Sequence, residues 1–203
     1  MSERPFVHLH CHTDYSLLDG ACDIKKLISV VKRQGMPSVA MTDHGNLFGA
    51  VEFYNEANKE GIHPVIGCEM YVSQSGHKSR SDQDRYNHLV LLAETQEGYK
   101  NLINLVSTGY LDGFYYKPRV DKDLLARHSK GLIATSACLR GDINEKIVAD
   151  RYGDAKTLDV QLSADELAKR QAGWRKPPLR VERGVLAKYA RTVNCASEGA
   201  TTG

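Results

Sequence analysis

Short apolar runs alternate with helical patterns along the first two thirds of the chain. The run at residues 5–12 alternates apolar and polar positions, which places His8, His10 and His12 on one face of a predicted strand. Further apolar runs predict strands at residues 38–42, 65–72, 89–93 and 131–137.

The segments between these runs have apolar spacings typical of amphipathic helices. Asp23 is a suitable N-cap for the first helix, which Gly35 ends. Two more helices are predicted at residues 47–61 and around 99–106. This alternation of strands and helices indicates parallel βα units, in either a barrel or an open doubly wound sheet. The polar run at residues 73–84 is predicted to be a mobile loop.

Composition excludes several classes of protein. The chain has 203 residues, of which 41% are hydrophobic and 26% charged, so it is neither a disordered nor a collagen-like sequence. No run approaches the roughly 18 apolar residues of a membrane helix, and the start lacks the features of a signal peptide, so we expect a cytoplasmic protein with no membrane contact. Five scattered cysteines without a Cys-x-x-Cys pair indicate reduced thiols. A net charge of +2 does not by itself indicate nucleic-acid binding.

Residues of metal-binding types lie where the predicted strands give way to loops. They are His10 and His12 after the first strand, Asp19 in its loop, His44 after the second, Glu69 in the third and Cys138 after the fifth. Because the carboxyl ends of parallel strands meet at one face, we expect these side chains to converge. His88 is an exception, since it opens its apolar run rather than closing it.

Imidazoles, carboxylates and one thiolate at one face suit divalent transition metals, with zinc or manganese favoured. Two or three such ions activate water and neutralise phosphate oxygens. The spacing of these residues alone is a moderate signal of a metal site. A single His-x-His on a strand is more often incidental. Asp43 either orients a ligating imidazole or caps the following helix, and a hydrogen-bonded role behind the ligands is favoured for His8. Lys117 and Arg119 are candidate phosphate contacts, whereas an ordinary solvated surface is favoured for Arg80 and Arg85.

Several stretches together carry a family resemblance. They are residues 6–21, 40–47, 66–71, 87–93, 113–119 and 136–139. In this order they resemble the N-terminal PHP (polymerase and histidinol phosphatase) domain of the bacterial DNA polymerase III alpha subunit. The match covers about residues 4–155 and is highly specific, because generic PHP phosphatases share the histidine motifs but not the wording of residues 15–21 and 113–119.

The resemblance implies an α/β fold, a partial and truncated TIM-like (βα) barrel with a multinuclear metal site. Carried over by position, the ligands are His10, His12, Asp19, His44, Glu69, His88 and Cys138. Asp43 and His8 are placed behind them, and no catalytic group is expected beyond metal-activated water. The expected cofactors are divalent ions, zinc or manganese, with magnesium as an alternative. The family also uses a late aspartate and histidine, and no histidine follows His128 in this chain.

The resemblance further implies an N-terminal fragment of the replicative polymerase, a DNA-directed DNA polymerase and nucleotidyltransferase. Its PHP module is expected to hydrolyse phosphoesters or phosphodiesters, as in proofreading, and the polymerase active site is expected to lie outside this chain. The implied partners are DNA, through the full-length protein, and replicase subunits such as the proofreading exonuclease. A rival hypothesis is a non-catalytic, metal-stabilised module that supports the replicase and docks a partner subunit.

The end of the chain carries a second resemblance. Residues 158–168, 183–191 and 196–200 are similar to the extreme C-terminus of dihydroxyacid dehydratases. We therefore expect a truncated PHP domain at residues 1–155 and an unrelated short α/β tail at residues 156–203, joined by a fusion or an assembly error. A broken dehydratase is the third hypothesis, and the absence of the parts that hold that family's iron-sulfur cluster argues against it.

Overall fold

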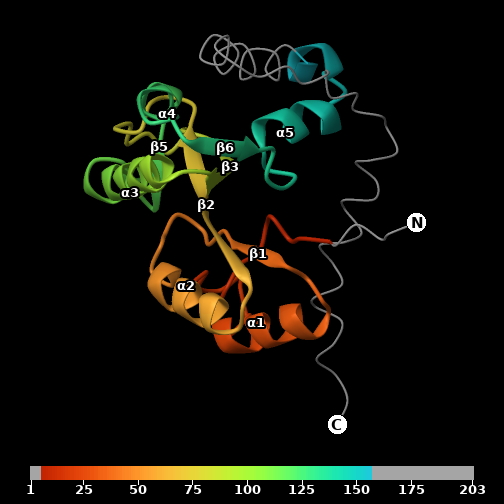
Figure 1. Cartoon of the computed structure of the whole chain (residues 1–203). Coiled ribbons are helices and arrows are strands. Elements are labelled where there is room, and N and C mark those ends of the chain that lie inside the picture. The colour runs from red at the N-terminus through yellow and green to blue at the C-terminus, as the bar shows by residue number, and fades with distance from the viewer. Residues whose placement is uncertain (1–5, 157–203) are drawn as a thin grey trace, which may run out of the picture. The chain divides into compact units, whose positions relative to one another are not determined.

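The computed structural model describes residues 6–156, which form a mixed α/β fold. The helices are α1 (Ile24–Arg33), α2 (Ala50–Lys59), α3 (Gln96–Leu111), α4 (Lys122–Arg127) and α5 (Asp142–Val148). The strands are β1 (Ser38–Met41), β2 (His63–Ser73), β3 (Tyr86–Ala93), β4 (Phe114–Tyr115), β5 (Lys117–Val120) and β6 (Leu132–Thr135). Figure 1 shows α1 and α2 beside β1 at one end of the long strand β2, with α3 and α4 near its other end.

Local signals account for most of these elements. The predicted strands at 38–42, 65–72, 89–93 and 131–137 correspond to β1, β2, β3 and β6, and the predicted helices correspond to α1, α2 and α3. The side chain of Asp23 caps α1 by accepting a hydrogen bond from the backbone N–H of Lys26 at 2.9 Å. The sequence pattern missed the short elements β4, β5, α4 and α5.

The strand directions differ from the predicted parallel arrangement. The six-stranded sheet has the order β4-β5-β2-β3-β6, and β1 pairs with the first half of β2. The pairs β1–β2 and β2–β5 are parallel, whereas β2–β3, β3–β6 and β4–β5 are antiparallel. A loop without a helix, residues 74–85, joins β2 to β3, and the chain therefore returns antiparallel beside its predecessor. The α/β class is confirmed, and an open six-stranded arrangement is consistent with a partial barrel.

The N-terminal segment is not the regular strand that its alternation predicts. The carbonyls of His8 and Cys11, three residues apart, accept hydrogen bonds from the backbone N–H groups of Ala40 and Thr42, two residues apart, both at 2.8 Å. One extra residue therefore bulges out of the N-terminal segment. Alternation is broken at this bulge, so His8 does not share a face with His10 and His12.

Two large apolar clusters hold the described elements together, beside a small one of Ala40, Val90 and Leu92. One joins α1, β1 and α2 through buried residues such as Ile28, Met41 and Phe53. The other packs α3 and α4 on β2, β3 and β5, with Leu102 and Leu105 fully buried. Strand β2 contributes to both clusters. Ile66 packs against the first, and Cys68, Met70 and Val72 belong to the second.

The loop between β2 and β3 is tied to the rest of the fold. Arg119 in β5, 1% exposed, forms an ion pair with Asp84 of the loop and donates a hydrogen bond to the carbonyl of Ser79. Asp84 also accepts a hydrogen bond from the Ser73 hydroxyl at 2.8 Å. The prediction that Arg119 contacts phosphate is therefore wrong, because its guanidinium is buried against the loop.

Within residues 6–156, no helix is long and apolar enough to cross a membrane. Residues 157–203, which make up nearly all of the predicted α/β tail, lie outside the described range. The expected domain boundary near residue 155 and the dehydratase-like tail therefore stay predictions.

Candidate metal centre

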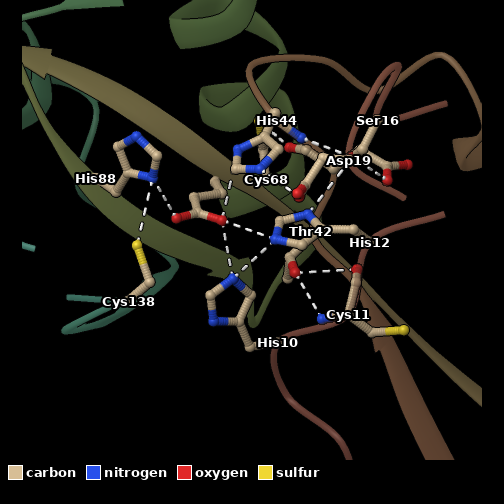
Figure 2. A network of polar contacts seen from close by, with 12 residues as sticks. His10, Cys11, His12, Ser16, Asp19, Thr42, His44, Cys68, His88 and Cys138 are labelled. Carbon is tan, nitrogen blue, oxygen red and sulfur yellow. Dashed lines mark hydrogen bonds and ion pairs between the residues drawn. The ribbon is translucent and has the colours of Figure 1, made fainter. Parts of the chain in front are cut away.

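The predicted ligands gather around one buried carboxylate. Glu69 lies within β2, and its side chain is 1% exposed. Figure 2 shows His10, His12, His44 and His88 directed toward one region from separate parts of the chain. Pairing along the sheet explains how His44 and His88 reach this region.

Backbone pairing places His44 beside Glu69. The chain continues past β1 along the edge of β2, where Glu69 donates its N–H to the carbonyl of Asp43 at 3.0 Å and accepts from the N–H of Gly45 at 2.9 Å. Gly45 has a φ of 63°, and a Cβ there would lie 2.7 Å from Pro118 Cγ. The turn that follows His44 therefore requires glycine.

The direction of β3 accounts for His88, which did not fit the rule of strand carboxyl ends. Because β3 runs antiparallel to β2, its first residues lie beside the last residues of β2, and His88 pairs with Tyr71. Strand β6 is antiparallel to β3, so it ends at the same side of the sheet. Cys138 follows β6, and its Sγ lies 3.5 Å from Nδ1 of His88. An amino end of an antiparallel strand thus meets the carboxyl ends of its neighbours.

The tightest contacts form a triangle of three atoms. Glu69 Oε2 lies 2.8 Å from Nε2 of His10 and 2.9 Å from Nε2 of His12, and these two nitrogens are 3.1 Å apart. Protons alone do not satisfy this triangle. If both nitrogens carry a proton, two N–H groups oppose each other, and if one lacks it, a lone pair opposes the carboxylate. A cation coordinated by all three atoms removes the conflict.

A second set of contacts surrounds His44 and His88. His44 Nε2 lies 2.9 Å from Asp19 Oδ2, and its Nδ1 lies 3.5 Å from Glu69 Oε2 without a hydrogen bond. His88 Nδ1 lies 2.7 Å from Glu69 Oε1. Within the described range, His44 Nδ1 and His88 Nε2 are the buried side-chain nitrogen atoms that have no hydrogen-bond partner. Unpaired buried nitrogens of this kind are costly unless a ligand occupies them.

The electrostatics of the cluster follow from these contacts. Burial alone raises the pKa of Glu69, but hydrogen bonds with His10, His12 and His88 outweigh it and hold that pKa well below its usual range. Burial lowers the pKa of His88, yet hydrogen bonds with Cys138 and Glu69 raise it to about 9. Burial and the neighbouring His12 lower the pKa of His44. The carboxylate is thus ionised, as a metal ligand must be.

Three overlapping groups of these side chains are able to hold a divalent metal ion. They are His10, His12 and Glu69; His12, Asp19 and His44; and His44, Glu69 and His88, each with ligand atoms within 4.8 Å of one another. Cys138 is outside these groups and touches the cluster through His88. The groups overlap at His12, His44 and Glu69, so the three groups form one continuous set of donor atoms.

Asp43 and His8, the two residues predicted to lie behind the ligands, differ in their contacts with the cluster. Asp43 is fully buried and neither caps α2, whose N-cap is Gly49, nor reaches an imidazole directly. It accepts hydrogen bonds from Thr13 and Ser16, and Ser16 contacts His12. The ring of His8 packs edge-on against Phe6 at 4.8 Å and is in none of the three groups. The bulge in the N-terminal segment separates it from them.

The sequence reasoning missed Ser16 and Tyr71. Ser16 lies in an irregular loop, where no periodicity marks it. Tyr71 follows Glu69 by two positions in β2, so the alternation of a strand could have indicated it. Its ring stacks on His44 at 5.9 Å and lies edge-on to His88 at 5.2 Å. Lys117 lies over the same ring, 5.5 Å from its centre, and is exposed beside the cluster.

Comparison with protein families defines the class of the chain. The model of the PHP domain matches residues 8–171, so the chain belongs to the PHP domain family. This match covers the whole cluster around Glu69 and continues beyond the described residues.

Curated relatives show which members of that family the chain is similar to. The chain is similar to the DNA polymerase III subunit alpha of three bacteria, Borreliella burgdorferi, Helicobacter pylori and Thermus aquaticus. The identities are 53% over 74% of this chain, 55% over 76% and 43% over 94%, respectively. The chain spans only 13%, 14% and 16% of the lengths of these relatives. Among solved structures, an amidohydrolase from Chromobacterium violaceum is 18% identical. The matched region covers 60% of this chain and 48% of the amidohydrolase chain, and the TM-score of 0.35 is too low to support an inference.

Proposed function

We propose that this chain is the N-terminal PHP module of a replicative DNA polymerase alpha subunit, and that its cluster hydrolyses phosphoester or phosphodiester bonds with divalent metals. The observation that carries the proposal is the convergence of four imidazoles on the buried carboxylate of Glu69, with two imidazole nitrogens left unpaired. Similarity to polymerase alpha subunits supplies the biological setting.

The donor set favours zinc or manganese over magnesium. Imidazole nitrogens are the majority of the converging atoms, and magnesium prefers oxygen ligands. The proposed ligands are those predicted from the sequence, His10, His12, Asp19, His44, Glu69, His88 and Cys138. Divalent ions held at such a site activate water and neutralise the charge of phosphate oxygens.

The chain's own groups prepare this site. Glu69 stays ionised because three imidazoles hydrogen-bond to it, so it is ready to bind a cation across the physiological pH range. His88 holds a proton in the metal-free chain, and that proton must leave before its nitrogen coordinates a metal. Lys117, exposed beside Tyr71, is suited to contact a phosphate oxygen of the substrate.

The larger protein's properties follow as part of the proposal. We assign DNA binding, association with replicase subunits such as the proofreading exonuclease, and a cytoplasmic location to the full-length subunit. Nucleotide transfer is assigned to parts of that subunit outside this chain. The chain corresponds to about one seventh of the length of its relatives, which supports this division.

Metal analysis combined with hydrolysis assays tests the proposal. The purified full chain, loaded with zinc or manganese, is assayed on bis-p-nitrophenyl phosphate and on a single-stranded DNA oligonucleotide. We expect metal-dependent hydrolysis that Glu69→Gln abolishes and that the matched histidine variant His8→Gln leaves within about twofold of wild type. Bound metal without turnover would instead support the rival hypothesis of a structural module and overturn the proposed reaction.

A further inference from the structure

A hydroxyl outside the proposed ligand set connects a buried carboxylate to the cluster. Asp43 is fully buried and accepts hydrogen bonds from the Thr13 backbone N–H at 2.6 Å, the Thr13 hydroxyl at 2.7 Å and the Ser16 hydroxyl at 2.7 Å. None of the proposed metal ligands contacts this carboxylate through its side chain. Its only side-chain link to an imidazole, among the described contacts, is Ser16.

Ser16 has three polar partners and one proton. Its oxygen lies 2.7 Å from Asp43 Oδ1, 3.1 Å from the backbone nitrogen of His44 and 3.4 Å from Nδ1 of His12. A carboxylate only accepts hydrogen bonds, so the hydroxyl proton is directed to Asp43. The Ser16 oxygen is then an acceptor for its other two partners, the His44 N–H and Nδ1 of His12.

We propose that Ser16 is a positioning residue that keeps a proton on Nδ1 of His12 and so leaves Nε2 of that ring available for a metal ion. The inference deepens the proposed function, because it rests on His12 being a ligand. Metal-binding imidazoles are oriented in this way when their second nitrogen donates to a fixed acceptor. Here the acceptor is a hydroxyl that Asp43 holds in one orientation.

The need for such a device comes from the other side of the ring. His12 Nε2 lies 2.9 Å from Glu69 Oε2, which draws a proton to that nitrogen in the absence of metal. A neutral His12 with its proton on Nε2 presents no lone pair to a cation. Ser16 opposes this tautomer by accepting from Nδ1.

The loop holds Ser16 rigidly enough for this role. Ser16 is 2% exposed, its N–H donates to the carbonyl of Thr13 at 3.0 Å, and its carbonyl accepts from the N–H of Gly20 at 2.8 Å. A Cβ at Gly20 would lie 1.9 Å from the Thr13 carbonyl oxygen, so the beginning and the end of the loop are in close backbone contact. His44 also donates its backbone N–H to Ser16, so one hydroxyl supports two neighbouring ligand residues.

Two matched variants separate positioning from general support of Asp43. Ser16→Ala and Thr13→Val each remove one hydroxyl that donates to Asp43, but only Ser16 touches an imidazole. Nitrogen-15 spectra of histidine-labelled, metal-free full chain report whether His12 carries a proton on Nδ1, with the signal assigned by its loss in His12→Gln. Zinc titration calorimetry of the same proteins reports affinity.

We expect the Nδ1 proton of His12 in wild type and Thr13→Val, and its loss in Ser16→Ala. Zinc affinity should fall about 10- to 100-fold in Ser16→Ala and much less in Thr13→Val. A wild-type His12 without a proton on Nδ1 overturns the inference, and this spectrum alone decides it if Ser16→Ala does not fold. Equal affinity of Ser16→Ala and wild type also overturns it. Failure of zinc to bind wild type, with the Nδ1 proton present, counts against the proposed metal function instead.

Discussion

The buried ion pair between Arg119 and Asp84 provides a sharp test of how the loop before β3 is held. Both side chains are essentially inaccessible, at 1% and 0% exposed. Arg119 also donates to the carbonyls of Ser79 and Gly113. Asp84→Asn keeps the shape of the carboxyl group but leaves the guanidinium buried without a counter-charge.

The expected cost is about 3 to 5 kcal/mol of unfolding free energy, the range for removing one partner of a buried pair. That is about a fifth or more of the roughly 5 to 15 kcal/mol typical of a folded domain. The assay is urea unfolding of the full chain, followed by circular dichroism. Glu97→Gln is the control, because its pair with Lys130 at 2.9 Å is exposed, at 54% and 76%, and worth about 0 to 1 kcal/mol. A loss in Asp84→Asn no larger than in the control would refute the reasoning.

Two further predictions concern the cluster. In the metal-free chain, burial lowers the pKa of His88 but Cys138 and Glu69 raise it to about 9, above an unfolded value of about 6.5. This contribution to stability is complete below pH about 6.5 and is lost as pH rises through 9, so the urea midpoint should fall across that window in wild type and less in His88→Gln. Zinc at about 100 times its dissociation constant should stabilise wild type and His8→Gln by about 2.7 kcal/mol, and His12→Gln by much less. Equal stabilisation of the two histidine variants in a thermal scan would exclude His12 from the zinc site.

The sequence predicted the parts of the site that local patterns mark. His10, His12, His44 and Glu69 were found because each lies in or just after an apolar run that forms a strand or pairs with one. His88 appeared to break the rule, since strand direction cannot be read from periodicity. The helix-free loop between β2 and β3 was the available signal that β3 returns antiparallel.

Other features depend on contacts between residues far apart in the sequence. The bulge that separates His8 from the cluster appears only in the hydrogen bonds that His8 and Cys11 accept from Ala40 in β1 and from Thr42 just after it. Ser16 owes its position to Asp43, 27 residues away, and Arg119 is buried by Asp84, 35 residues away. Composition and spacing treat such residues as ordinary polar positions, because the partner that removes them from solvent is set by the tertiary fold.

An anomalous difference map of crystals of the full chain, soaked in manganese, tests the central claim most directly. The claim is that the side chains around Glu69 form a divalent metal site. It predicts a peak about 2.0 to 2.3 Å from Nε2 of His12 and from the Glu69 carboxylate, with further peaks near His44. Ordered side chains at the cluster without any anomalous peak between them would contradict the account.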